Sequence, residues 1–144
     1  MGQSVTAVCA SCGTRNRVGL DRLHQGPVCG KCGGEILRPR PEILGPQLFD
    51  KVVGGSELPV VVDFWAPWCG PCKAMGPAFE QAAQTLHGRA VLAKVNTEQH
   101  QGLAGRFGIR SIPTLMLFRN GREAVRQAGA MDAISIASWV NGNL

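Results

Sequence analysis

The sequence predicts an α/β fold in which a mixed central sheet is covered by helices on both faces, preceded by a small metal-held module. A strand, helix and strand succeed one another over residues 60–95, and Asn120-Gly121 separates two extended runs. The first succession requires parallel strands, whereas Asn-Gly is typical of an antiparallel hairpin, so the sheet is mixed. With 144 residues, 44% of them hydrophobic, the chain suffices for one core and an appendage, which excludes a large multidomain enzyme.

The first 40 residues have few large apolar side chains, and the main ones are Leu20, Leu23, Ile36 and Leu37. Such a segment cannot bury a sufficient core alone. Arg38-Pro39-Arg40-Pro41 follows, and its alternating prolines disfavour helix and predict a semi-rigid linker. We therefore predict two domains, a module with its linker at residues 1–40 and a larger domain at residues 41–144.

The cysteines of the module have the spacing of a zinc ribbon. Two Cys-x-x-Cys pairs are separated by sixteen residues, and their members are Cys9, Cys12, Cys29 and Cys32. Four thiolates at this spacing predict a tetrahedral, structural zinc site whose binding energy orders the segment. Gly13 and Gly33 follow the two pairs, where a positive φ lets the backbone fold around the metal.

Other interpretations of these cysteines are disulfide-like pairs, idle thiols and an iron site. A reducing cytosol disfavours the disulfides. Four thiolates already fill a tetrahedral shell, so we expect His24, which lies between the pairs, to be a surface residue and not a ligand. His87 and His100 belong to no motif.

The first elements of the larger domain follow from apolar periodicity. Residues 48–53 have helical spacing and end at Gly54-Gly55, and the β-branched run Val60–Trp65 predicts a buried strand. A longer helix begins near Cys69 and ends at Gly88, with a kink expected at Pro77, and a strand follows over residues 90–95.

The remaining elements are set by turn and capping residues. A less periodic stretch at residues 101–107 is predicted to be helical. Asn120-Gly121 joins strands predicted at residues 114–119 and 123–127. Asp132 is suited to capping a final helix, which Asn141-Gly142 ends.

The third Cys-x-x-Cys pair, Cys69 and Cys72, has a different setting, because it opens a helix inside the strand–helix–strand unit. A helix amino terminus stabilises a thiolate through its free N–H groups and dipole. We therefore predict that Cys69 is the nucleophile of thiol-disulfide exchange and that Cys72, one turn further in, resolves the mixed disulfide. A structural metal knuckle would need another unused cysteine pair, and the sequence has none.

Asp63 stands out because it interrupts an apolar strand. An ionised carboxylate in a buried strand is costly, so its pKa should be raised, which suits a proton acceptor for Cys72. Lys94 on the following strand is a candidate modulating charge. The alternative, an aspartate at an exposed strand edge, fits poorly with the apolar residues on both sides.

Residues 43–144 resemble thioredoxins. The resemblance is carried by Asp63-Phe64-Trp65-Ala66, Trp68 to Cys72, Lys94, Arg110-Ser111-Ile112-Pro113-Thr114, Asn120-Gly121 and Gly129. The amino-terminal module also resembles the ribbon of the zinc-binding thioredoxins. The resemblance implies a thioredoxin fold, reduction of protein disulfides, and recycling by a flavin-containing, NADPH-dependent thioredoxin reductase, with no flavin or nucleotide on the chain itself.

The resemblance also implies a substrate-binding surface around the dithiol. It suggests that Pro113 follows a cis peptide bond, which would leave the backbone of Ile112 open to an extended substrate strand. Without the resemblance, the rarity of cis X–Pro bonds in folded proteins predicts a trans bond. The surrounding surface would consist of Trp68, Gly70, Pro71 and Gly129.

Charge and hydropathy leave two rival functions open. Residues 1–40 contain six basic and two acidic residues of a chain with net charge +5, which leaves binding of nucleic acid or an acidic protein as an alternative function of the module. An oxidant or isomerase of a secretory compartment is opposed by the lack of a signal sequence and by Gly70-Pro71. No long apolar run occurs, so we expect no membrane binding. We also expect a cytoplasmic monomer that acts on oxidised proteins and does not bind nucleic acid.

Overall fold

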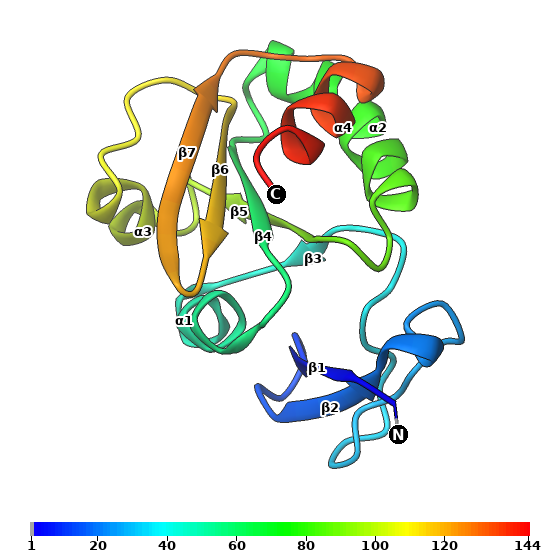
Figure 1. Cartoon of the computed structure of the whole chain (residues 1–144). Helices are drawn as coiled ribbons and strands as arrows, with labels where there is room; N and C mark the ends of the chain where they lie inside the picture. The colour runs from blue at the N-terminus through cyan, green and yellow to red at the C-terminus, as the bar shows by residue number, and fades with distance from the viewer. Residues whose placement is uncertain (1) are drawn as a thin grey trace.

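The computed structural model describes residues 2–144, and it contains two sheets (Figure 1). The small sheet pairs β1 (Ser4–Val8) with β2 (Arg15–Gly19), and the short 3-10 helix η1 (Leu20–Arg22) follows it. The large sheet has the strand order β3-β5-β4-β6-β7. Its strands are β3 (Glu42–Ile43), β4 (Val60–Trp65), β5 (Val91–Asn96), β6 (Thr114–Arg119) and β7 (Arg122–Ala128).

The large sheet is mixed, as predicted. Its central strand β4 runs parallel to β5 and antiparallel to β6. The crossover between β4 and β5 is α2 (Gly70–Thr85), and the hairpin between β6 and β7 turns at Asn120-Gly121. Both turn residues have positive φ, 54° at Asn120 and 78° at Gly121, as a primed hairpin turn requires.

Helices cover both faces of the large sheet because the side chains of β4 alternate. Val60, Val62 and Phe64 pack with α1 (Pro46–Gly55) and α3 (Gln101–Arg106). Val61 packs on the opposite face with α2 and α4 (Ala133–Asn141). Asp63 and Trp65 have the same strand parity as Val61, so the sheet directs them toward the α2 face.

Asp132 has its predicted role at the start of a helix, whereas α2 ends before the predicted residue. Asp132 caps α4 by accepting a hydrogen bond from the Ser135 N–H at 2.8 Å. Pro46 occupies the first turn of α1, where its missing N–H has no cost. The helix α2 ends at Thr85, three residues before Gly88, and Pro77 lies within it.

The amino-terminal ribbon does not stand apart from the larger domain. Its strand β1 lies against α1, and Val8 belongs to the same apolar cluster as Phe49 and Val52 of that helix. The Glu57 N–H also donates to the Thr6 carbonyl at 3.0 Å. The proline-rich segment at residues 38–41 is also fixed to the larger domain, because Arg38 forms an ion pair with Glu42 of β3. Within the described residues, no helix is both long and apolar enough to cross a membrane.

Candidate active site and metal centre

The turn between β4 and α2 positions the dithiol. Cys69 is the amino-terminal cap of α2, and its Sγ accepts a hydrogen bond from the Cys72 N–H at 3.2 Å. Cys69 and Cys72 form a disulfide, with their Cα atoms 5.2 Å apart. Both cysteines are buried, at 5% and 3% exposure. When the pair is reduced, the same Cys72 N–H and the helix dipole favour a thiolate at Cys69.

The loop before β6 approaches the dithiol from the other side. The Ile112–Pro113 peptide bond is cis, as the resemblance implied, and the Ile112 carbonyl oxygen lies 3.8 Å from the Cys69 Sγ. Gly129 joins this loop because its N–H donates to the Pro113 carbonyl at 2.9 Å. Its φ of 99° is a conformation that glycine adopts without strain. Trp68, 69% exposed, gives the site an apolar edge.

Asp63 is fully buried on β4. Neither of its carboxylate oxygens has a hydrogen-bond partner within residues 2–144. Burial raises the pKa of Asp63 from 3.8 to about 7, and the positive charge of Lys94 opposes this rise. Lys94 is the residue of β5 paired with Asp63, and its Nζ lies 4.4 Å from the centre of the Trp65 ring.

The raised pKa of Asp63 predicts how the stability of the protein depends on pH. Between pH 3.8 and about 7 an unfolded Asp63 is ionised while a folded one is protonated, so stability falls as pH rises through this window. We expect Asp63→Asn to leave stability unchanged near pH 3.8 and to increase it by about 4 kcal/mol above pH 7. Urea unfolding of both proteins at pH 4, 6 and 8 measures this difference. A stability gain that does not grow with pH would contradict a buried, raised-pKa carboxyl.

The four ribbon cysteines form a single cluster. Their Sγ atoms all lie within 4.8 Å of one another, and two contacts join the two pairs, Cys9 to Cys32 at 3.7 Å and Cys12 to Cys29 at 3.6 Å. Zinc–sulfur bonds of about 2.3 Å in a tetrahedron separate the sulfurs by about 3.8 Å. The two contacts match this separation, so the four-cysteine cluster fits a zinc ion.

The two knuckles of the ribbon have matching backbones. Gly13 and Gly33 have φ of 79° and 76°, and each donates its N–H to the carbonyl of the first cysteine of its pair. In the second knuckle, the N–H groups of Lys31 and Gly34 also donate to the sulfurs of Cys29 and Cys32, each at 3.4 Å. Hydrogen bonds from the backbone N–H groups of Cys32 and Lys31 lower the pKa of Cys29 to about 6, which favours the thiolate that a metal needs. The hydrogen bond from the Gly34 N–H lowers the pKa of Cys32, but the side chains of Cys9 and Cys12 outweigh it and raise that pKa to about 11.

The predicted cysteines thus lie at two separate sites. Cys69, Cys72, Ile112 and Trp65 share one apolar cluster at the amino end of α2, whereas the four remaining cysteines lie in the ribbon. Trp65 was predicted to be core but is only half-buried against the dithiol. A contact between His24 and His87 had no sequence signal, because 63 residues separate them.

Comparisons with known proteins agree with this division. The thioredoxin family model matches residues 41–142, and the model described as "Thioredoxin 2, N-terminal" matches residues 8–34. The chain is 42% identical to thioredoxin C-3 of Corynebacterium nephridii over 95% of its own length and 94% of that protein. It is 40% identical to a thioredoxin of Haemophilus influenzae over 67% of its length and 90% of that protein.

A solved structure gives the same result. The chain resembles a mutant thioredoxin from Halobacterium salinarum NRC-1 with a TM-score of 0.66 and 30% identity. The match covers 73% of this chain and 91% of the other.

Proposed function

This chain belongs to the thioredoxin family, and we propose that Cys69 and Cys72 are the dithiol through which it reduces protein disulfides. The observation that carries the assignment is the position of the Cys69 sulfur as the cap of α2. A sulfur there is stabilised as a thiolate without a neighbouring base. Cys72 lies one turn inside the helix, and its side chain is more deeply buried.

The reaction conserves atoms and electrons through two exchanges. The Cys69 thiolate attacks one sulfur of a substrate disulfide, forming a mixed disulfide and releasing the other sulfur as a thiolate. The Cys72 thiol then loses its proton and attacks the Cys69 sulfur, which forms the Cys69–Cys72 disulfide and releases the second substrate thiolate. Two electrons pass to the substrate, and the released thiolates take up protons.

Asp63 is the proposed acceptor of the Cys72 proton, directly or through water. A pKa of about 7 lets the carboxyl both take and return a proton near neutral pH. Its strand parity directs it toward the α2 face, where Cys72 also lies. Lys94 keeps that pKa from rising further, which maintains a useful fraction of the carboxylate.

Substrate recognition is assigned to the surface around the disulfide. The backbone of Ile112, next to the cis Pro113, is suited to pairing with an extended substrate segment, which tolerates many sequences. The exposed Trp68 with Gly70, Pro71 and Gly129 would contact the flanking substrate residues.

The ribbon is proposed as a structural domain at residues 1–40, followed by the catalytic domain at residues 41–144. Cys9, Cys12, Cys29 and Cys32 would hold zinc, which supplies folding energy and no redox chemistry. Free thiols suit a reducing compartment, so we place the protein in the cytoplasm, as a monomer without flavin or nucleotide.

The proposed recycling partner is a flavin-containing thioredoxin reductase that uses NADPH. With catalytic amounts of the protein, excess insulin and such a reductase, we expect continuous NADPH oxidation matched by insulin thiols. Without the reductase, a pre-reduced protein should reduce one disulfide per chain and stop. Stoichiometric insulin reduction without any NADPH turnover would remove this class of partner while keeping the dithiol chemistry.

A further inference from the structure

Two histidines meet where the ribbon contacts the larger domain. His24 belongs to the ribbon, just after η1, and His87 follows the carboxyl end of α2. Their Nδ1 atoms lie 3.1 Å apart, and the rings are perpendicular with centroids 4.6 Å apart. Neither the dithiol nor the four-cysteine cluster includes these side chains.

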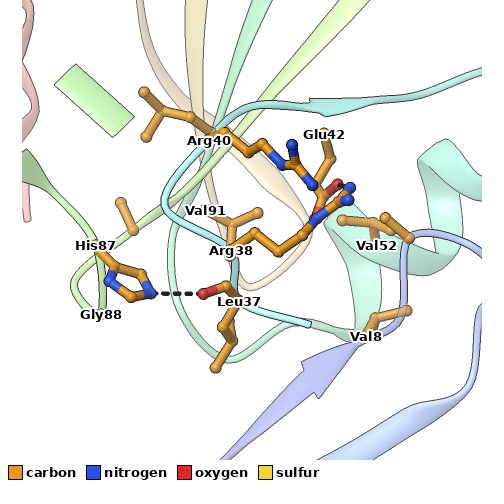
Figure 2. Close-up of a pocket in the computed structure, with 12 residues that line it drawn as sticks. Val8, Leu37, Arg38, Arg40, Glu42, Val52, His87, Gly88 and Val91 are labelled. Carbon is orange, nitrogen blue, oxygen red and sulfur yellow. Dashed lines mark hydrogen bonds and ion pairs between the residues drawn. The ribbon is translucent and has the colours of Figure 1, made fainter. Parts of the chain in front are cut away.

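The tautomer of His87 is set by its second nitrogen. Its Nε2 lies 2.6 Å from the Leu37 carbonyl oxygen, and Figure 2 shows this contact as a dashed line. A carbonyl oxygen only accepts, so Nε2 carries the proton. A neutral His87 therefore presents an unprotonated Nδ1 toward His24.

Gly88 fixes the orientation of His24. A Cβ at this position would lie 2.7 Å from the His24 Nε2, so the ring is packed directly over the glycine. Gly88 also has a φ of 84°, a backbone conformation that a residue with a side chain adopts only with strain. The ring of His24 thus has its Nε2 edge over Gly88 and its Nδ1 toward His87.

We propose that the Nδ1 atoms of His24 and His87 bind a divalent transition-metal ion, a second metal site that spans the ribbon and the larger domain. Metal–nitrogen bonds of about 2.0–2.1 Å at about 90–110° separate two ligand nitrogens by about 2.9–3.4 Å. The observed 3.1 Å falls within this range. The His87 bond to the Leu37 carbonyl is the kind of outer contact that orients a ligating histidine.

The binding step needs only a proton shift. In the neutral pair the proton between the two Nδ1 atoms belongs to His24, and it moves to the Nε2 of that ring when the ion binds. His24 is exposed, so water completes the coordination shell. Imidazole nitrogens with water suit Ni²⁺, Cu²⁺ and Zn²⁺.

The surrounding charges limit the affinity of the site. Arg38 and Arg40 line the same cleft as His87, between the ribbon and the larger domain (Figure 2). Among the described residues, the one carboxylate that lines this cleft is that of Glu42, which is already paired with Arg38. Affinity therefore rests on the two imidazoles, and protons compete with the metal as pH falls.

The test is a Ni²⁺ titration of the full-length, zinc-loaded, disulfide form, followed by calorimetry and by proton NMR of the histidine rings. Zinc retained in the four-cysteine site and the intact disulfide keep Ni²⁺ from all six thiols. We expect one Ni²⁺ per chain, paramagnetic broadening of the His24 and His87 ring signals but not of His100, and weaker binding at pH 5.5 than at pH 7.5.

Three matched variants locate the ion. His24→Gln and His87→Gln should each weaken Ni²⁺ binding about 10-fold or more, whereas His100→Gln should not. Glutamine at position 87 can still donate to the Leu37 carbonyl, and His24 is exposed, so at least one variant keeps its fold and zinc. Unchanged Ni²⁺ affinity in both His24→Gln and His87→Gln, or equal broadening of all three histidines, would overturn the proposal.

Discussion

Replacing Cys69 by serine is expected to reduce disulfide reduction to the background rate, because a serine hydroxyl is not ionised at the helix end and does not attack a disulfide. Cys72→Ser should behave differently. Its Cys69 still attacks, but no second thiol resolves the product, so covalent mixed disulfides with substrate should accumulate. Non-reducing electrophoresis after mixing each variant with oxidised insulin or cell extract separates the two outcomes.

The double variant Cys69→Ser/Cys72→Ser is the control, and it should trap nothing while retaining zinc and fold. Complexes recovered with Cys69→Ser but not with Cys72→Ser would reverse the two roles. The structure argues against reversal, because only the Cys69 sulfur accepts an N–H of the first helical turn and lies beside the Ile112 carbonyl.

The candidate site residues were predictable because their patterns are local. The spacing of the cysteines indicated both the metal cluster and the dithiol, and Asp63 was recognised as a polar interruption of an apolar strand. The strand β4 has the predicted bounds, since its Val-rich run is buried on both faces. The cis bond before Pro113 followed from family resemblance alone, because no local pattern distinguishes it from a trans bond.

Features that depend on distant contacts were missed. Strand β3 has only two residues, and one of them, Ile43, is 71% exposed, so the strand shows no hydrophobic pattern. It forms through its pairing with β5. The ribbon strands β1 and β2 have five residues each, too few to show a clear periodicity, and β2 is mostly polar. The packing of Val8 against α1 and the meeting of His24 with His87 arise only when the ribbon contacts the larger domain.

Loss of the ribbon metal is expected to unfold the ribbon and leave the catalytic domain active. The ribbon has a small core of its own, consisting of Ala7, Cys9, Val18, Leu23, Cys29 and Ile36, and two of these are proposed metal ligands. Structural zinc contributes about 10–16 kcal/mol to such sites, far more than this cluster provides. Cys29→Ser, which removes one ligand, or strong chelation should therefore expose the β1 and β2 amides to exchange.

Unfolding of the ribbon should lower the stability of the larger domain only slightly. Val8 is 8% exposed and packs with Phe49 and Val52, so losing it should cost that domain about 1.5–3 kcal/mol, within the stability of an ordinary domain. Hydrogen exchange should show faster exchange in α1 but continued protection in β4 and β5. Val28→Ala, an exposed ribbon position, is the matched control and should change neither region.

Insulin reduction by the Cys29→Ser protein decides between two roles for the ribbon. The dithiol, the cis loop and Asp63 belong entirely to residues 63–113, and no ribbon residue belongs to their apolar cluster. Activity should therefore change by no more than a few-fold when measured with the same reductase supply as the zinc-loaded protein. If β4 and β5 remain protected but insulin reduction is lost, the ribbon must contribute directly to the active site, and the division at residues 40 and 41 would be wrong.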